Sequence, residues 1–460
     1  MKRIELFTNH FLYDIMGVMI MKNKSNPLNI LAILIPIPIF YFHGGFFAWQ
    51  FVKVCCLFLP LIITSGTMKR GLLLGICVGA TITSIIGLLA YYGISFSKEL
   101  VVELDGVLRL QSTLGYANTA AVCCGVGVLL CGYYYCVKEK YKFLIIFVGL
   151  INLFAFILTF SRMGLGCFLF TIIVILNYKY NQIRIPSLVG FLLLLSAIAV
   201  IFVTGNEHYV LGSTLASRLI YYQDAIKLLI KYPFGVGTNG WVDAQYMIQS
   251  AIYSVKYVHN GFLQFALDGG GFALLGFVFF IVFIFNRLHK KYKESHNLLT
   301  LCLIGLFTFV ILHSFVDIDL TFSTILIIIG VIGSFAINIR KYVRKPVCIL
   351  IALFVIISVT YSFYAPKKFE NIESISRKYY SAKISGDKET AFEMAKRWFE
   401  SAPRQQLAVT EYYGCLRENR KFDEIEQLRQ KVNELNNTKN YFTQYIDKEQ
   451  NIILEAEHYE

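Results

Sequence analysis

Long apolar runs joined by short polar connections make up most of the chain. Runs of roughly 16 to 25 residues are long enough to cross a bilayer as helices. They predict about eleven spans, at residues 28–43, 47–65, 71–93, 116–137, 142–160, 163–178, 186–204, 260–286, 297–316, 320–339 and 346–364. The pattern therefore predicts an all-α fold, a polytopic transmembrane helical bundle.

Polar stretches divide the chain into five regions. An interfacial N-terminus, residues 1–27, precedes the first seven spans at 28–204. A large loop at 205–259 separates these spans from the last four at 260–364, and a soluble tail occupies 365–460. The polar interruption between the two apolar blocks is the only long water-facing stretch before the tail. We therefore expect the chemistry of the protein in or next to it.

Within the loop, the sequence predicts one amphipathic helix that lies on the outer membrane surface. Ser213-Thr214 favour its start and Tyr232-Pro233 its end. Its predicted apolar face consists of Leu215, Leu219, Tyr222, Ile226 and Leu229. Arg218 lies beside this face, where its guanidinium binds either a lipid headgroup or a substrate phosphate.

The tail is charged and rich in helix-forming residues. Helical apolar patterns begin after Gly386 and after Arg420, a spacing close to the tetratricopeptide period. As a tetratricopeptide-like repeat, the tail would bind a protein or peptide. As an alternative of equal weight, it is a solvated helical cap on the membrane domain.

Composition adds that no metal or cofactor is expected. Hydrophobic residues make up 56% of the chain and charged residues 16%. Most of the 11 cysteines lie inside apolar runs, where a thiol behaves as a small hydrophobe, and their spacing is not that of a metal site. The net charge of +13 is spread between the spans rather than gathered in one patch, which argues against nucleic acid as a partner.

The same basic residues predict the orientation. With the N-terminus in the cytoplasm, every inner connection between the predicted spans carries Lys or Arg, as the positive-inside rule requires. The large loop and the tail are then extracytoplasmic. The sequence therefore predicts a multi-pass protein of the cell (plasma or inner) membrane, with a site that opens outward, away from ATP and nucleotide sugars.

Arg162 and His259 are the strongest candidates for chemistry. Arg162 is a lone guanidinium in a very short turn between two apolar spans, which is costly unless it faces water or a partner. The alternative for Arg162 is snorkelling to the interface. His259 precedes a long apolar helix for which Asn260 is a good N-cap, so it is either a general base or an interfacial capping residue.

Weaker candidates accompany these two residues. His313 and Asp317 are four residues apart, so on one helix they share a face and orient a substrate or pair with each other. Asn118 stands at the outer start of a span and either caps that helix or contacts substrate. The glycine-rich run from Pro233 to Gly240 lacks the P-loop lysine and a preceding strand, which favours a turn over a phosphate cradle.

Together these segments resemble the superfamily of O-antigen ligases and O-antigen polymerases, which are integral membrane glycosyltransferases. The resemblance covers most of the membrane part and depends on the order of five loose motifs. They are Leu114-Gly-Tyr-Ala-Asn118-Thr-Ala120, Ser161-Arg162-x-Gly164, Arg218 followed by Tyr232-Pro233-x-Gly235, His259-Asn260-x-x-Leu263 and His313-Ser314-x-x-Asp317.

The resemblance implies transfer of a glycan from an undecaprenyl diphosphate carrier to an acceptor hydroxyl, with inversion and without metal. By the same resemblance, Arg162 and Arg218 would bind the diphosphate and His259 would be the general base, with Asn118, Asn260, His313 and Asp317 near the substrate. The implied partners are the lipid-linked glycan donor, membrane lipid, and a glycan, lipid or protein acceptor. Two alternatives stay open: a transporter or flippase of lipid-linked oligosaccharide, and a non-catalytic membrane scaffold.

Overall fold

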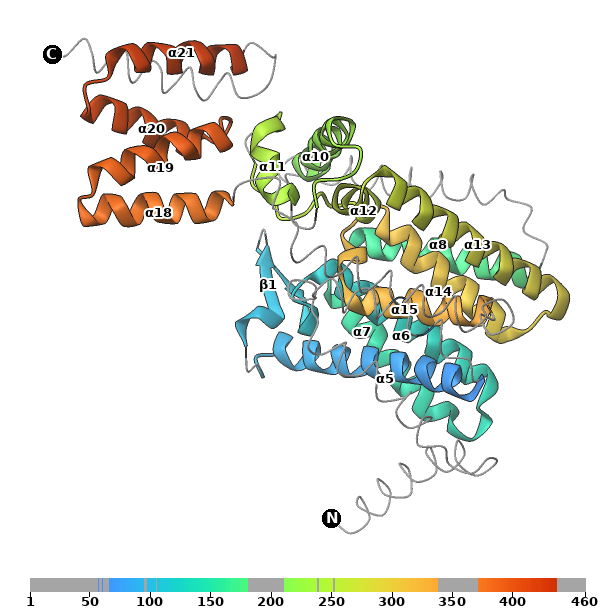
Figure 1. Ribbon diagram of the computed structural model, residues 1–460. Helices are drawn as coiled ribbons and strands as arrows, with labels where there is room; N and C mark the ends of the chain where they lie inside the picture. The colour runs from blue at the N-terminus through green and yellow to red at the C-terminus, as the bar shows by residue number, and fades with distance from the viewer. Residues whose placement is uncertain are drawn as a thin grey trace. The chain divides into compact units, whose positions relative to one another are not determined.

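A computed structural model describes residues 66–180, 211–337 and 371–436, apart from gaps at 95–96, 105, 238–239 and 251–252, together with residues 57 and 60. The described chain is mainly helical (Figure 1), as the apolar pattern predicts. The predicted spans at 28–43, 186–204 and 346–364, and nearly all of 47–65, lie outside the described residues.

The described residues contain five helices that are long and apolar enough to cross a membrane, which makes this a multi-pass membrane protein. They are α5 (Gly66–Tyr91), α6 (Ala117–Val137), α7 (Lys142–Leu158), α8 (Arg162–Tyr180) and α13 (Gly271–Ser295). Two shorter apolar helices, α14 (Leu298–Ser314) and α15 (Ser323–Ala336), coincide with two further predicted spans. Short 3-10 turns occur at η1 (Lys98–Leu100), η2 (Ser112–Leu114), η3 (Glu139–Tyr141) and η4 (Asp319–Thr321).

The chain divides into two compact units. The first contains α5 to α8, α13 from Val282 onward, α14 as far as His313, and α15. In it α5, α6 and α7 pack against one another (Figure 1), and Asn152 of α7 accepts a 2.9 Å hydrogen bond from the Ser84 hydroxyl of α5. A buried polar side chain that is hydrogen-bonded in this way fixes the register between two apolar helices.

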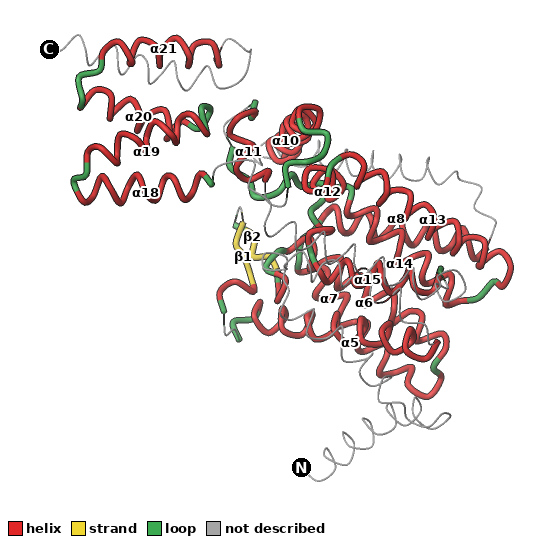
Figure 2. Tube along the Cα trace, viewed as in Figure 1, coloured by secondary structure: helices red, strands yellow, loops and turns green. Residues whose placement is uncertain are grey.

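The first unit also contains a β-hairpin, which the all-α prediction missed. Strands β1 (Val101–Leu104) and β2 (Val107–Leu110) are antiparallel, with Val102 opposite Arg109 (Figure 2). The sequence between the strands is Asp105-Gly106, a strong hairpin signal, and Gly106 has a positive φ of 74°. The hairpin therefore follows from local turn chemistry that the search for long apolar runs passes over.

The second unit contains α10 (Leu211–Lys231), α11 (Gly240–Ile248), α12 (Gly261–Gly269), the segment Ser314–Ile318 and the tail helices. A helix, α10, lies where the sequence predicts one in the loop, and Tyr222 and Leu229 of the predicted apolar face pack against the core of this unit. Ala225 and Leu228 are buried in a core with Trp241 of α11 and Leu267 of α12. Leu219 and Ile226, two members of the predicted apolar face, are 52% and 46% exposed.

The span predicted at residues 260–286 is wrong as a single helix. It consists of α12 and α13, separated at Gly270, which has a φ of 87°. The turn after α10 packs closely against this break: Val236 N donates to Leu267 O at 2.7 Å and Gly271 N donates to Pro233 O at 2.8 Å. A side chain at Gly270 would place its Cβ 2.7 Å from the Phe234 carbonyl carbon, so only glycine fits here.

Four helices form the described part of the tail: α18 (Ile372–Ser385), α19 (Lys388–Ser401), α20 (Gln406–Glu418) and α21 (Phe422–Asn436). Each packs against the next around Trp398, Tyr379 and Leu416. The loop helix α11 contributes Tyr246 to this core, and its Asp243 accepts a 3.2 Å hydrogen bond from Ile372 N. The tail and α11 therefore share one hydrophobic core.

Candidate functional site

Three residues far apart in the sequence meet at the carboxylate of Asp317, whose side chain is completely buried. Nη2 of Arg218 lies 3.4 Å from Asp317 Oδ2, and Nη1 of the same guanidinium donates to Val316 O at 2.9 Å. On the other side, Nδ1 of His259 lies 3.6 Å from Asp317 Oδ1. The structure thus brings together Arg218, His259 and Asp317, which the sequence identified separately.

Backbone contacts hold His259 in place. His259 has a φ of +57°, an uncommon left-handed conformation for a residue with a side chain. The next residue, Asn260, caps α12 by accepting hydrogen bonds from Phe262 N and Leu263 N, each at 3.0 Å. Gly261 N then donates to Asp317 O at 2.8 Å. The N-cap predicted for Asn260 is present, and it ties the start of α12 to the segment that carries Asp317.

A tyrosine of α10 completes this arrangement. The hydroxyl of Tyr222 donates to the carbonyl oxygen of His259 at 2.7 Å. Burial raises the pKa of Tyr222, and the nearby Asp317 carboxylate acts in the same direction against the opposing effect of Arg218. The phenol therefore stays protonated and keeps its donor role across the neutral range. Arg218 and His259 remain 17% and 26% exposed, so both side chains reach solvent while Asp317 does not.

A second polar cluster in the first unit surrounds the turn before Arg162. Arg109 of β2 donates from Nε to Thr159 O at 2.9 Å and from Nη2 to Asn118 Oδ1 at 2.7 Å. Ser161 caps α8 by accepting a 3.2 Å hydrogen bond from Gly164 N. Arg162 is the first residue of α8, and its side chain is exposed. Arg109 thus connects the start of α6 to the turn that precedes Arg162.

His313 pairs with Asp319, and its predicted position on one helix face with Asp317 is wrong. Nδ1 of His313 lies 2.5 Å from Asp319 Oδ2, and both side chains are fully buried. Thr119, next to Asn118, donates to the other oxygen of Asp319 at 2.8 Å. Asp317 is no helix neighbour of His313 because α14 ends at Ser314. These contacts give His313 a buried structural position in the first unit.

The glycine-rich run after α10 is a turn, as the sequence favoured. Gly235 and Gly237 have φ values of 81° and 84°, and Gly235 N donates to Tyr232 O at 2.9 Å. A Cβ on Gly235 would lie 2.6 Å from Gly270 N. Gly235 therefore allows two backbone segments to touch, and Gly237 allows the positive φ of the turn.

Sequence reasoning did not single out Arg109 or Asp319 as site residues. Arg109 lies in the polar connection between the predicted spans at 71–93 and 116–137, and no spacing rule links it to Asn118 or Thr159. Asp319 lies two residues after Asp317 and differs from it in its partners. Among the residues that the structure describes, no three His, Cys, Asp or Glu side chains are grouped as metal ligands would be.

A comparison with known protein families finds a match over the middle of the chain. The family described as O-antigen ligase matches residues 145–278, which include Arg162, Arg218 and His259. No curated protein matches the chain. The O-antigen ligase superfamily comprises membrane proteins of the ligase and polymerase type that transfer glycans. The match over residues 145–278 therefore supports the resemblance of this multi-pass membrane protein to the O-antigen ligase superfamily.

Proposed function

We propose that the protein transfers a glycan from an undecaprenyl diphosphate-linked donor to an acceptor hydroxyl, as a polysaccharide polymerase or an O-antigen-ligase-like transferase. The single observation that carries this proposal is the contact of Arg218 and His259 with the buried Asp317 carboxylate. In this proposal the Arg218 guanidinium binds the anion and His259 accepts the proton, on either side of one buried carboxylate. Glycan transfer from a diphosphate to an alcohol needs both of these functions.

In the proposed step, the acceptor oxygen attacks the anomeric carbon of the donor sugar. Its proton passes to Nε2 of His259 while Asp317 faces Nδ1 and orients the ring. The bond between the anomeric carbon and the diphosphate oxygen breaks, and the electron pair leaves with the undecaprenyl diphosphate. Arg218 stabilises the negative charge that develops on the leaving oxygen. The new bond forms on the opposite face of the sugar, which gives inversion.

A 3.6 Å separation between His259 and Asp317 is longer than a hydrogen bond. Catalytic contacts are often long in the absence of substrate and shorten in the reactive complex. The left-handed backbone at His259 and the Asn260 cap limit the positions that the ring can take. We therefore assign Asp317 a positioning role, which replaces the substrate contact expected from the sequence.

Arg162 is proposed as a second ligand of the donor diphosphate. Its exposed side chain begins α8 beside a turn that Arg109 and Asn118 hold in place. A second guanidinium adds positive charge and hydrogen-bond donors for a diphosphate. In this proposal Asn118 positions the turn, and Asn260 acts through the helix cap rather than through the substrate.

The proposed site opens to the extracytoplasmic face of the cell membrane, with the N-terminus in the cytoplasm. Lipid-linked donors with a diphosphate are already activated, so the reaction needs no nucleotide on that side. The tail, on the same side, would hold an acceptor or another protein of envelope assembly. Helices α18 and α20 begin at residues 372 and 406, a spacing equal to the roughly 34-residue tetratricopeptide period.

The proposal is tested with purified full-length protein in lipid vesicles and a lipid-linked glycan from the source cell. His259→Ala and Arg218→Ala are compared with wild type by gel and mass spectrometry of the products. We expect a loss of about 10²-fold to 10⁴-fold in each variant. His289→Ala and Arg287→Ala, which remove the same side-chain types from the first unit, serve as controls.

The outcomes separate the candidate functions. Transfer without added nucleotide by wild type and both controls, but not by the site variants, supports the transferase, and the product size separates polymerase from ligase. If no form transfers glycan while wild type moves the lipid across the bilayer, the protein is a transporter. If no form transfers glycan or moves the lipid, the scaffold alternative replaces catalysis.

A further inference from the structure

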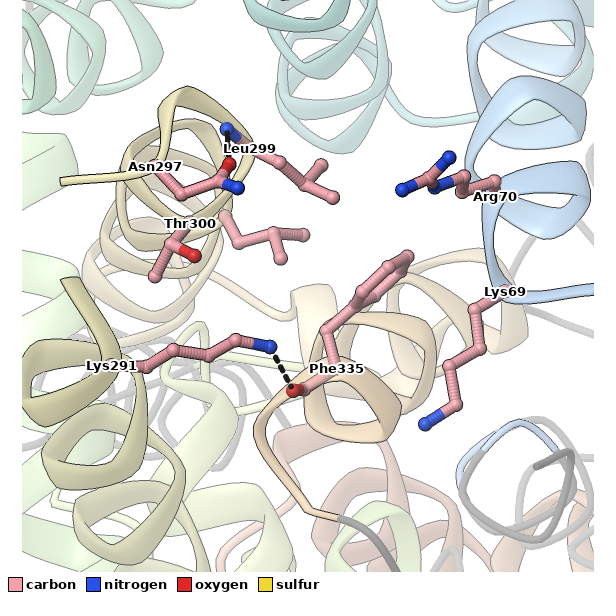
Figure 3. A pocket seen from close by; sticks show the side chains of 8 residues that line it. Lys69, Arg70, Lys291, Asn297, Leu299, Thr300 and Phe335 are labelled. Atoms are coloured by element: carbon pink, nitrogen blue, oxygen red, sulfur yellow. Dashed lines mark hydrogen bonds between the residues drawn. The ribbon is translucent and has the colours of Figure 1, made fainter. Parts of the chain in front are cut away.

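A cavity of about 300 Å³ lies at the ends of four helices of the first unit (Figure 3). Cationic side chains reach it from two helices: Lys69 and Arg70 from the first turn of α5, and Lys291 from the last turns of α13. Asn297, Leu299 and Thr300 contribute the start of α14, and Phe335 the end of α15. The residues that line this cavity include three cations and no carboxylate.

This cavity is remote from the two polar clusters of the same unit, the one in which Arg109 contacts Asn118 and the one in which Asp319 contacts His313. The hydroxyl of Ser112, just after the β-hairpin, donates to the carbonyl oxygen of Thr83 in α5. At 1.5 Å per residue, Thr83 is about 20 Å along α5 from Lys69. On α14, Asn297 and His313 mark opposite ends of the helix. The cavity thus occupies the opposite ends of the helices, which the basic connections predict to be cytoplasmic.

Two of the cations are held by backbone carbonyls. Lys69 Nζ donates to Ser334 O, and Lys291 Nζ donates to Phe335 O at 3.4 Å, both in the last turn of α15. Lysines commonly bind the last carbonyls of a helix in this way. The C-terminus of α15 carries a partial charge of about −0.5, which is small beside the two full positive charges it receives. The cavity therefore remains strongly positive.

Arg70 and the start of α14 complete an anion-binding geometry. Arg70 is exposed, and its guanidinium extends from α5 into the open space in front of Leu299 and Asn297 (Figure 3). Asn297 Oδ1 accepts a 2.8 Å hydrogen bond from Leu299 N and caps α14. The positive end of that helix dipole adds to the field of the cations rather than opposing it.

We propose that this cavity binds a phosphate group, carried either by an anionic phospholipid headgroup or by a free phosphate compound. Basic pockets between transmembrane helices on the cytoplasmic side are suited to phosphate headgroups. A volume of about 300 Å³ is sufficient for a headgroup but not for a large soluble cofactor. The site is separate from Arg162 of the proposed transfer reaction, because it lies at the other end of the first-unit helices.

The test uses the purified full-length protein in detergent, with dioleoylphosphatidylglycerol, dioleoylphosphatidylcholine or inorganic phosphate added. Lipid retention is measured by native mass spectrometry and the phosphate effect by thermal stability. We expect wild type to retain the anionic lipid preferentially. In Arg70→Gln, retention should fall about fivefold, the effect of one charge near a membrane surface.

Lys293→Gln is the matched control, since Lys293 is an exposed cation of α13 that does not line the cavity. Lys291→Gln is the second cavity variant. If wild type shows no preference between the lipids but is stabilised by phosphate in a manner that depends on Arg70, the ligand is a free phosphate compound. If neither probe depends on Arg70 or Lys291, or if Lys293→Gln has the same effect, the proposal is overturned.

Discussion

Oδ1 of the fully buried Asp317 faces Nδ1 of His259 at a distance of 3.6 Å, although 58 residues separate them in the sequence. The second oxygen of the same carboxylate faces Arg218. A buried charge is tolerated only where partners compensate for lost hydration. Asp317 therefore links the position of the proposed base to that of the proposed diphosphate ligand.

The substitution Asp317→Asn tests this link. The asparagine side chain would keep the size of the aspartate but remove the charge that faces His259 and Arg218. We expect the glycan transfer rate to fall by about 10²-fold or more, because the ring loses its orienting partner. The rate is measured with the lipid-linked donor at saturation. Asp423→Asn, which removes a carboxylate from the first turn of α21, should leave it unchanged.

An equal loss in both aspartate variants would contradict the positioning role. The distinction also requires that the Asp317→Asn protein remains folded, which retention of its size-exclusion profile and helical circular dichroism would show. If Asp317→Glu keeps part of the transfer rate and Asp317→Asn does not, the charge of the side chain rather than its shape is needed.

A second prediction concerns Arg109, which connects β2 to Asn118 and to the carbonyl of Thr159. Lysine keeps the charge but cannot make two hydrogen bonds from a planar fork. In Arg109→Lys we expect weaker donor binding, because the turn that presents Arg162 loses a support. The KM for the lipid-linked donor should rise several-fold with a smaller change in kcat. A change in kcat alone would contradict a role in donor binding.

The membrane part was predictable where the apolar pattern is long and uninterrupted. Helices α5 to α8 coincide with predicted spans because apolar length alone decides whether a segment crosses a bilayer. The break at Gly270 was not predicted, although the run Asp268-Gly-Gly-Gly271 disfavours a continuous helix. The approach of Phe234 shows why the helix stops at this glycine. Local composition contains no information about that distant contact.

The site was predictable residue by residue but not as an arrangement. The helix rule paired His313 with Asp317, whereas the helix ends at Ser314 and Asp319 takes the histidine. Arg218 and Asp317 are 99 residues apart, and no spacing rule connects them. Their contact depends on tertiary packing, which a single sequence does not reveal.

The tail contains an ion pair that predicts a pH dependence. Glu411 accepts hydrogen bonds from Tyr379, Tyr380 and Lys383. Although burial alone would raise the pKa of Glu411, these donors lower it overall. The same contact raises the pKa of Lys383 against the effect of burial. Because the pKa of Glu411 is lowered in the folded protein, the carboxylate stabilises the fold at pH values above the pKa of the unfolded carboxyl. This stabilisation is lost as the pH falls through the pKa of the folded protein.

We therefore expect lower hydrogen-exchange protection factors in α18 and α20 of the full-length protein under acid conditions, below the ordinary pKa of a glutamate. The stabilisation from Lys383 has the opposite pH dependence. It is present below the pKa that this lysine has in the unfolded chain, and it is lost as the pH rises through the raised pKa of the folded protein. Glu411→Gln should exchange faster at neutral pH and lose most of the acid dependence. Glu373→Gln on the exposed surface of α18 is the control. Identical acid profiles for wild type and Glu411→Gln would rule out this ion pair as the source.

The last prediction concerns Gly270, whose φ of 87° separates α12 from α13. In Gly270→Ala, the new Cβ would meet the backbone of Phe234 and Pro233 at less than 3 Å, so the turn after α10 must move. Strain of this kind costs of the order of 1–3 kcal/mol. Gly276→Ala, in open space within α13, should instead be neutral or stabilising, because alanine favours helix. Thermal stability of the purified protein should therefore fall for the first variant alone.

Since α12 begins at the Asn260 cap next to His259, the transfer rate of Gly270→Ala should fall as well. Equal stability of the two alanine variants would show that the contact between the turn and the helix break is not needed.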